Sequence, residues 1–167
     1  MNESVRKSIE AQIGHEFGAA HAYLSRAAYF EGQNLTGMAS WMRAQSQEEV
    51  THAMKFFEFL LDRGATPELP GIPKPPHGFT SPVHAFTTAL EHEQKVTRPI
   101  YDLYELALAE KDYPAQILLQ WFVTEQTEEE KSTNGIVDRL KMVEGSRSAL
   151  LILDNELGVR TGDAHGV

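Results

Sequence analysis

Residues 41–59, WMRAQSQEEVTHAMKFFEF, carry the pattern that decides the fold. Apolar and aromatic residues recur there at intervals of three and four, which is the period of an amphipathic helix in a bundle. The resulting stripe consists of Trp41, Gln45, Glu49, His52, Phe56 and Phe59. This stripe predicts that Glu49 and His52 both face the interior, close together on one side of the same helix.

The same helical period extends over nearly the whole chain and predicts four long helices and one short one. They cover residues 4–30, 36–63, 81–111 and 114–143, followed by a short apolar helix over residues 148–157. Residues 64–81 contain five prolines, so the segment is not helical, and it is too long for a tight turn. We therefore expect it to be a crossover connection. Two helical hairpins joined by one long crossover are a known bundle topology, and we expect it for this chain.

The predicted fold is therefore all-α, a four-helix bundle with one long crossover and a short fifth C-terminal helix. We expect residues 1–158 to form this single domain. Residues 159–167 are expected to be a flexible C-terminal tail.

The composition limits the classes of function. The absence of cysteine excludes disulfides and thiol nucleophiles, and a reducing compartment suits such a chain. No secretory signal is visible, and the longest apolar run, Ala149–Leu153, is far shorter than the roughly 20 residues of a membrane span. We therefore expect a cytoplasmic protein without a membrane partner.

The formal net charge of -9 argues against nucleic acid as a partner and favours cations, although an acidic surface can simply keep a protein in solution.

Each of the other three predicted stripes also contains a carboxylate near its middle. The first is Ile9, Ile13, Glu16, Ala20, Tyr23 and Ala27. The third is Phe86, Leu90, Glu93, Thr97, Ile100 and Tyr104. The fourth is Leu118, Phe122, Glu125, Glu129, Ser132, Ile136 and Leu140. Burying such carboxylates in the ionised form without partners costs several kcal/mol each.

A positive charge or a proton must neutralise these carboxylates, and the four stripes contain no Lys or Arg. Protons and metal ions remain as alternatives. Four glutamates and one neutral imidazole carry a formal charge of -4, which two divalent cations balance, and an oxygen-rich set with one imidazole suits iron or manganese. A single Glu-x-x-His pair occurs by chance in many helices, whereas acids at mid-length in all four helices are specific. The sequence therefore favours bound metal over protonated or water-bridged carboxylates.

These residues lie in motifs that resemble the bacterial and archaeal non-haem ferritins, over residues 1–157. The motifs are Glu16, Gln47-Glu48-Glu49-Val50-Thr51-His52, His92-Glu93-Gln94, Leu119-Gln120-Trp121 and Glu125-Gln126-Thr127-Glu128-Glu129-Glu130. The resemblance implies a ferritin-like fold, ferroxidase activity and iron storage in a hollow shell, typically of 24 subunits. It implies no haem, because bacterioferritins carry a methionine where this chain has Val50 and a second Glu-x-x-His where it has Ser132.

The resemblance also assigns the ligands. It implies that Glu16, Glu49 and His52 hold one iron, and that Glu49, Glu93 and Glu129 hold the second, with Glu49 as the bridge. Gln126 matches a glutamine near the first iron. A third, inner iron site is implied for Glu48, Glu125 and Glu128 together with Glu129.

Other residues have weaker assignments. Tyr23 and Trp121 match aromatic residues that flank the iron pair in the family, and core packing is the alternative for both. The remaining histidines are expected to be non-ligands: His15, His21, His77, His84, His92 and His165. The methionines at helical spacing are expected to fill the core: Met38, Met42 and Met54.

Two other functions stay open at this point. A di-iron oxidase without storage needs the five ligands but not the apolar segment 148–157, which we expect to pack against symmetry-related subunits through Leu150, Leu151 and Leu153. A purely structural bundle needs the apolar stripes but has no reason to bury Glu16, Glu49, Glu93 and Glu129 together. The oxidant also stays open, since dioxygen and hydrogen peroxide both suit a di-iron centre.

Overall fold

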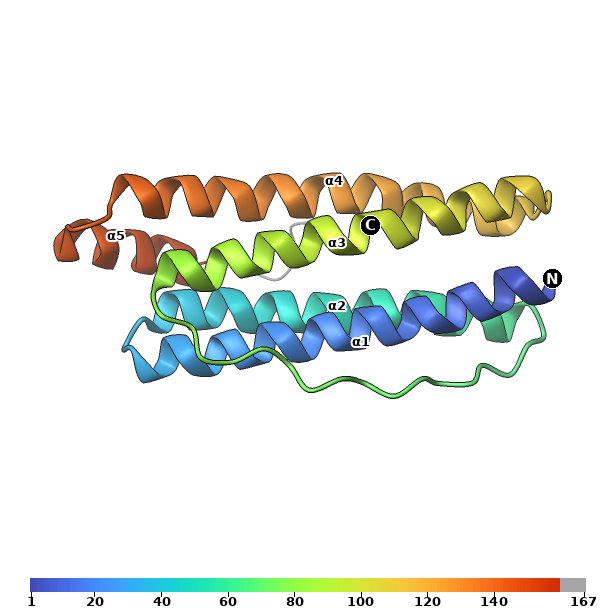
Figure 1. Cartoon of the computed structure of the whole chain (residues 1–167), viewed down its shortest axis with the longest axis horizontal. Helices are drawn as coiled ribbons and strands as arrows, with labels where there is room; N and C mark the ends of the chain where they lie inside the picture. Colours follow the sequence, from blue (N-terminus) through green and yellow to red (C-terminus); the bar gives the residue numbers. More distant parts are fainter. Residues whose placement is uncertain (160–167) are drawn as a thin grey trace.

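The computed structural model describes residues 1–159, which form five helices. They are α1 (Glu3–Gly32), α2 (Thr36–Asp62), α3 (Pro82–Ala109), α4 (Tyr113–Met142) and α5 (Arg147–Gly158). Figure 1 shows α1 and α2 as one antiparallel hairpin, α3 and α4 as a second, and α5 at one end of the bundle. The predicted all-α bundle with a short fifth helix is confirmed, and each predicted helix end lies within two residues of the observed one.

Capping side chains explain where the helices begin. Ser81 accepts a hydrogen bond from the backbone N–H of His84, and Pro82 occupies the first turn of α3, where its missing N–H costs nothing. Asp112 caps α4 by accepting from the N–H of Ala115 and also pairs with Arg63 at 2.7 Å. Between α3 and α4 the chain turns at Lys111, whose backbone has a positive φ of 53°.

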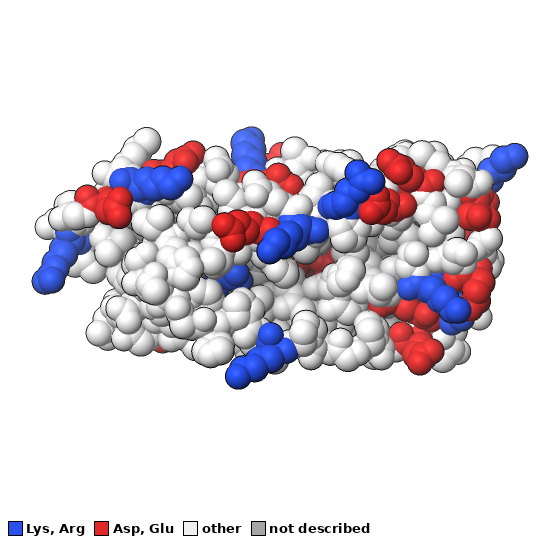
Figure 2. All heavy atoms as spheres, in the orientation of Figure 1, with Lys and Arg blue, Asp and Glu red and all other residues white. Residues whose placement is uncertain are grey.

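The predicted crossover, which connects α2 to α3, runs along the outside of the bundle beside α1 (Figure 1). It is attached by backbone contacts: Glu68 N–H donates to Glu10 at 3.0 Å, and Ser25 donates to the carbonyl of Pro76 at 2.6 Å. A Cβ atom on Gly14 would lie 2.4 Å from Cγ of Pro70, so glycine is needed where the crossover meets α1. Figure 2 shows one projecting basic side chain near the middle of the lower edge, and acidic and basic side chains together toward its right end.

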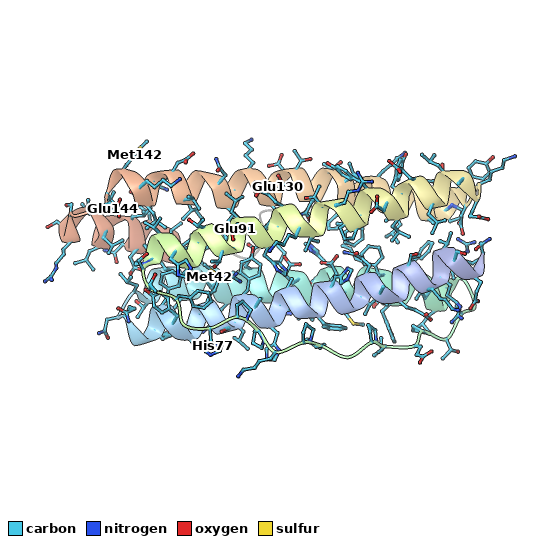
Figure 3. All side chains as sticks on the ribbon, in the orientation of Figure 1. Met42, His77, Glu91, Glu130, Met142 and Glu144 are labelled. Carbon is cyan, nitrogen blue, oxygen red and sulfur yellow. The ribbon has the colours of Figure 1, made fainter. Side chains whose placement is uncertain are left out.

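The bundle interior contains two apolar clusters separated by a polar layer. One cluster includes Phe30, Trp41 and Phe86, and the other includes Ile13, Phe56 and Phe122, which are all buried. Figure 3 shows Met42 between the two hairpins, whereas Met142 points away from α4. The buried residues between the two clusters include, in every long helix, the glutamates and the histidine singled out from the sequence.

Two expectations about packing need correction. Met54 is exposed at its position on α2, so it does not fill the core as Met38 and Met42 do. Ser132, which was assigned to the buried stripe of α4, is exposed, and the next residue, Thr133, is buried instead. Residue 99, in the interior of α3, is a proline, and α3 continues past it to Ala109.

Helix α5 is fixed to the start of α2. The N-cap residue of α2, Leu35, offers no side-chain hydrogen bond. Asp154 of α5 supplies the missing acceptor, since its carboxylate accepts from the backbone N–H of Met38 at 2.7 Å and of Gly37 at 3.2 Å. A Cβ atom on Gly37 would lie 1.8 Å from the carbonyl oxygen of Asp154, so glycine permits this close approach. Leu153 of α5 is buried in the subunit's own core, whereas Leu151 is exposed.

We predict that Asp154→Ala lowers the free energy of unfolding by about 1–2 kcal/mol, because two helix N–H groups lose their acceptor. Chemical denaturation followed by circular dichroism measures this difference. The matched control is Asp138→Ala, which removes an exposed aspartate from the same bundle. Equal stability of the two variants would show that Asp154 does not hold α5 in place.

The predicted tail, residues 159–167, lies outside the described residues except for Val159, and so does His165. Within the described residues no helix is both long and apolar enough to cross a membrane.

Candidate metal centre

The polar layer at mid-length of the bundle is formed by acidic side chains from all four long helices and one histidine. Glu16, Glu49, Glu93 and Glu129 are each less than 5% exposed, and His52 is 5% exposed. These residues lie on inward stripes whose other members are apolar or aromatic, so the helical period that builds the core also directs the carboxylates into it. The predicted burial of all five residues is confirmed.

One candidate ligand group combines Glu16 of α1 with Glu49 and His52 of α2. One ligand atom from each residue lies within 4.8 Å of the others. Nδ1 of His52 is 3.4 Å from Glu49 and 4.0 Å from Glu16. The pairing of Glu49 and His52 follows from their spacing of three on one helix, and Glu16 reaches them because α1 and α2 are antiparallel neighbours.

A second candidate group lies on the other side of the same imidazole. It consists of Glu48, His52, Glu125 and Glu129, whose ligand atoms also lie within 4.8 Å of one another. Nε2 of His52 is 4.0 Å from Glu125. His52 therefore stands between the two groups, with one ring nitrogen toward each.

Glu93 of α3 belongs to neither group, because its carboxylate is held by hydrogen bonds. The hydroxyl of Tyr23 donates to one oxygen, and the amide nitrogen of Gln126 donates to the other at 3.0 Å. The same amide nitrogen also donates to the backbone carbonyl of Glu93 at 2.8 Å. Tyr23 and Gln126 thereby fix the position of the only carboxylate that α3 contributes to this layer.

Two further glutamines, to which the sequence assigned no role, position carboxylates of the layer. Gln12 donates to Glu16 at 2.7 Å, and Gln45 donates to Glu129 at 2.5 Å. Both amides are buried. The sequence places Gln12 beside Glu16, because the two residues are four apart on one helix. It also places Gln45 inward, because that residue is in the stripe of α2. Periodicity alone does not show which carboxylate each amide contacts.

Burial shifts the acidity of these groups strongly. The pKa of Glu16 is raised to about 7, first by burial and further by the charge of Glu93. The pKa of Glu49 is raised well above its ordinary value by burial and by the charges of Glu93, Glu16 and Glu129. Burial also raises the pKa of Glu93, against the hydrogen bonds from Tyr23 and Gln126. A bound cation that replaces their protons therefore stabilises the ionised form of all three carboxylates.

The remaining predicted residues have distinct positions. Glu48 and Glu125 join the second group, whereas Glu128 is exposed and is in neither group. The ring of Trp121 is 5.4 Å from that of His52 and lies under Nζ of Lys55 at 4.4 Å. The ring of Tyr23 is edge-on to Trp41, with 6.3 Å between centroids. Both predicted aromatic residues thus contact the layer as well as the packed core.

This fold and this ligand set define a class, the helical bundles with a carboxylate-rich metal centre in the core. Comparison with known proteins narrows the class. Residues 6–143 match the family model described as a ferritin-like domain. The chain is 35% identical to a bacterial non-heme ferritin of Staphylococcus aureus over 98% of both chains. It is 36% identical to one of Bacteroides fragilis over 96% of this chain and 99% of that one.

Solved structures agree with these relatives. An open-pore ferritin from Archaeoglobus fulgidus superposes with a TM-score of 0.95 and 42% identity, covering 96% of this chain and 99% of that chain. A humanized archaeal ferritin superposes with a TM-score of 0.95 and 43% identity, covering 96% and 98%. The chain belongs to the ferritin family. Its general role is accordingly iron binding, with iron storage and oxidation.

Proposed function

We propose that the chain oxidises Fe(II) with dioxygen or hydrogen peroxide at a di-iron centre within each subunit, and stores the ferric product as an oxide mineral inside a shell of 24 subunits. The observation that carries this proposal is the position of Glu49. Its carboxylate lies beside His52, and its pKa responds to the charges of Glu93, Glu16 and Glu129. Such a central carboxylate is suited to bridge two cations.

The proposed ligands follow from this position. Glu16, Glu49 and His52 hold one iron, and Glu49, Glu93 and Glu129 hold the other. Tyr23 and Gln126 keep Glu93 directed toward the pair, as their hydrogen bonds to its carboxylate indicate. Gln126 can offer its carbonyl oxygen to the first iron once its amide nitrogen donates to Glu93.

Charge balance explains why the site takes up ferrous iron and then favours its oxidation. Two Fe(II) ions bring four positive charges to four glutamates, so the set of four stays neutral when its carboxyl groups exchange four protons for the two ions. Hard carboxylate oxygens stabilise the ferric state more than the ferrous state. The electrons pass to the oxidant, and hydrolysis of the ferric ions releases further protons.

The second group suggests how the product leaves. Glu48 and Glu125 extend the ligand set beyond His52, and we propose that with Glu128 and Glu129 they form an inner iron site. Glu128, which is exposed, is then the point at which ferric iron leaves the bundle. The proposal includes no haem and assigns the activity to the cytoplasm.

A di-iron oxidase without storage is the main competing function. It does not account for α5, where Leu151 and Ile152 are 54% and 61% exposed. Exposed leucine and isoleucine next to each other indicate a surface that another subunit covers. Self-assembly of the ferritin type, which the family supports, supplies that partner.

Iron loading tests storage directly. The purified protein receives Fe(II) in air in large excess over about two ions per subunit, the capacity of a di-iron centre. Protein and iron are then followed together by analytical ultracentrifugation. We expect iron far beyond that capacity to sediment with a protein assembly of about 24 subunits. Iron that stops at two per subunit, or precipitates apart from the protein, would leave an oxidase without storage.

A further inference from the structure

A groove with a volume of about 570 Å³ lies on the outside of the bundle between α1, α3 and the crossover. Its walls are mainly proline rings and small residues. The rings come from Pro70, Pro73, Pro75, Pro76 and Pro99. On the α1 side the groove is lined by Gly14, against which Pro70 packs, and by Gly18, where a Cβ atom would lie 3.9 Å from Pro73. The groove is therefore rigid and largely apolar, and it is separate from the carboxylate layer.

The polar side chains of the groove are all basic or imidazole groups. They are His15, Lys74, His92 and Lys95, and no aspartate or glutamate of residues 1–159 lines the groove. This is the opposite of the whole chain, whose formal charge is -9. Near the middle of the lower edge of Figure 2, the charged side chain that stands out beside the crossover is basic. An acidic protein that gathers positive groups in one apolar groove has a surface complementary to an anion.

One side-chain atom in the groove lacks a hydrogen-bond partner within the described residues. Nε2 of His92 is buried and has no hydrogen bond. Buried polar groups of this kind are usually satisfied by a ligand or by solvent. The groove thus offers a specific hydrogen-bonding position in addition to charge.

A hydrogen-bonded chain also connects the groove to the carboxylate layer. Gln12 directs its amide nitrogen to Glu16, which leaves its oxygen to accept from Nδ1 of His15 at 3.1 Å. The other ring nitrogen of His15 therefore remains for an occupant of the groove. The groove is within two hydrogen bonds of Glu16.

We propose that this groove binds a small organic anion that has an apolar body and one negatively charged group. The proline and glycine walls contact the body, and Lys74 and Lys95 attract the charge. The proposal does not depend on iron chemistry. None of the residues that line the groove is a proposed iron ligand.

The test uses two fluorescent probes of similar shape, anionic anilinonaphthalene sulfonate and neutral phenylnaphthylamine, titrated into the full-length assembled protein. The double variant Lys74→Gln with Lys95→Gln removes the charges and keeps the walls. We expect it to weaken the anionic probe about tenfold and to leave the neutral probe unchanged. The matched control, Lys131→Gln with Lys141→Gln, removes two exposed lysines of α4 and should change neither probe.

A second variant tests the location. Gly18→Leu places a side chain in the groove, and its Cβ atom would be in ordinary contact with Pro73 at 3.9 Å. We expect it to reduce the binding of both probes at this site, with unchanged helicity and assembly size. If Gly18→Leu does not fold, the lysine variants still test whether the groove binds the anionic probe. Equal affinity of the anionic probe for the wild type and the Lys74/Lys95 variant would overturn the proposal, as would undiminished binding to a folded Gly18→Leu.

Discussion

The double variant Glu49→Ala with His52→Ala is expected to lose fast Fe(II) oxidation, with an initial rate more than about 100-fold below that of the wild type. Changes to residues that merely orient metal ligands cost roughly 10- to 100-fold. Glu49 and His52 are proposed ligands, and Glu49 is the proposed bridge, so both iron positions lose affinity at once. The absorbance time course after aerobic addition of Fe(II) measures the rate.

The variant must be compared with a protein that has lost the same residue types elsewhere. Glu58→Ala with His21→Ala serves this purpose, because both residues are exposed. We expect this control to oxidise iron at the wild-type rate. Equal slow rates in the wild type and in the ligand variant would refute the ferroxidase proposal and leave an assembly role for the bundle.

The metal-free protein is expected to lose stability as the pH rises through the neutral range. Glu16 has a pKa of about 7 in the folded protein, against an ordinary value of 4.5. Between these values the folded state holds a proton that the unfolded state has released, so the free energy of unfolding falls with rising pH. The cost is absent below about pH 4.5 and complete above about pH 7, where this one carboxyl contributes roughly 3 kcal/mol. The raised pKa values of Glu49 and Glu93 act in the same direction.

The measurement is chemical denaturation of the wild type and of Glu16→Gln at several pH values between 5 and 8, after removal of metal. The glutamine variant should be the more stable protein at pH 8, and the difference should shrink toward pH 5. Taking the difference cancels the titrating groups that do not interact with Glu16, such as Asp112, whose pKa the hydrogen bond from Arg63 lowers against the effect of burial. Light scattering checks that the two proteins have the same assembly state. A difference that is constant over this range would show that Glu16 does not change protonation on unfolding.

Helix positions and the buried glutamates were predictable because both depend on local periodicity. A spacing of three and four residues places Glu16, Glu49, Glu93 and Glu129 inward whatever the partner helix is. The ends were predictable because Ser81 and Asp112 cap the helices that follow them. These are short-range features of the chain.

Other features depend on contacts between distant segments and were not predictable in this way. The face of α3 that packs inward includes Val96 and Leu103, while Leu90 and Tyr104 of the predicted stripe are only half-buried. The capping of α2 by Asp154 joins residues more than 100 positions apart. The position of His52 between two ligand groups likewise requires the relative placement of α1, α2 and α4. A periodic pattern gives the inward direction of a side chain but not its partner.

The central claim is that the carboxylate layer holds two iron ions bridged by Glu49. Crystals of the assembled protein, loaded with Fe(II) without oxygen, test it by anomalous scattering at the iron absorption edge. We predict two strong peaks per subunit, one among Glu16, Glu49 and His52 and one among Glu49, Glu93 and Glu129. No peak beside Glu49, or a single peak confined to Glu48 and Glu125, would contradict the proposed di-iron centre.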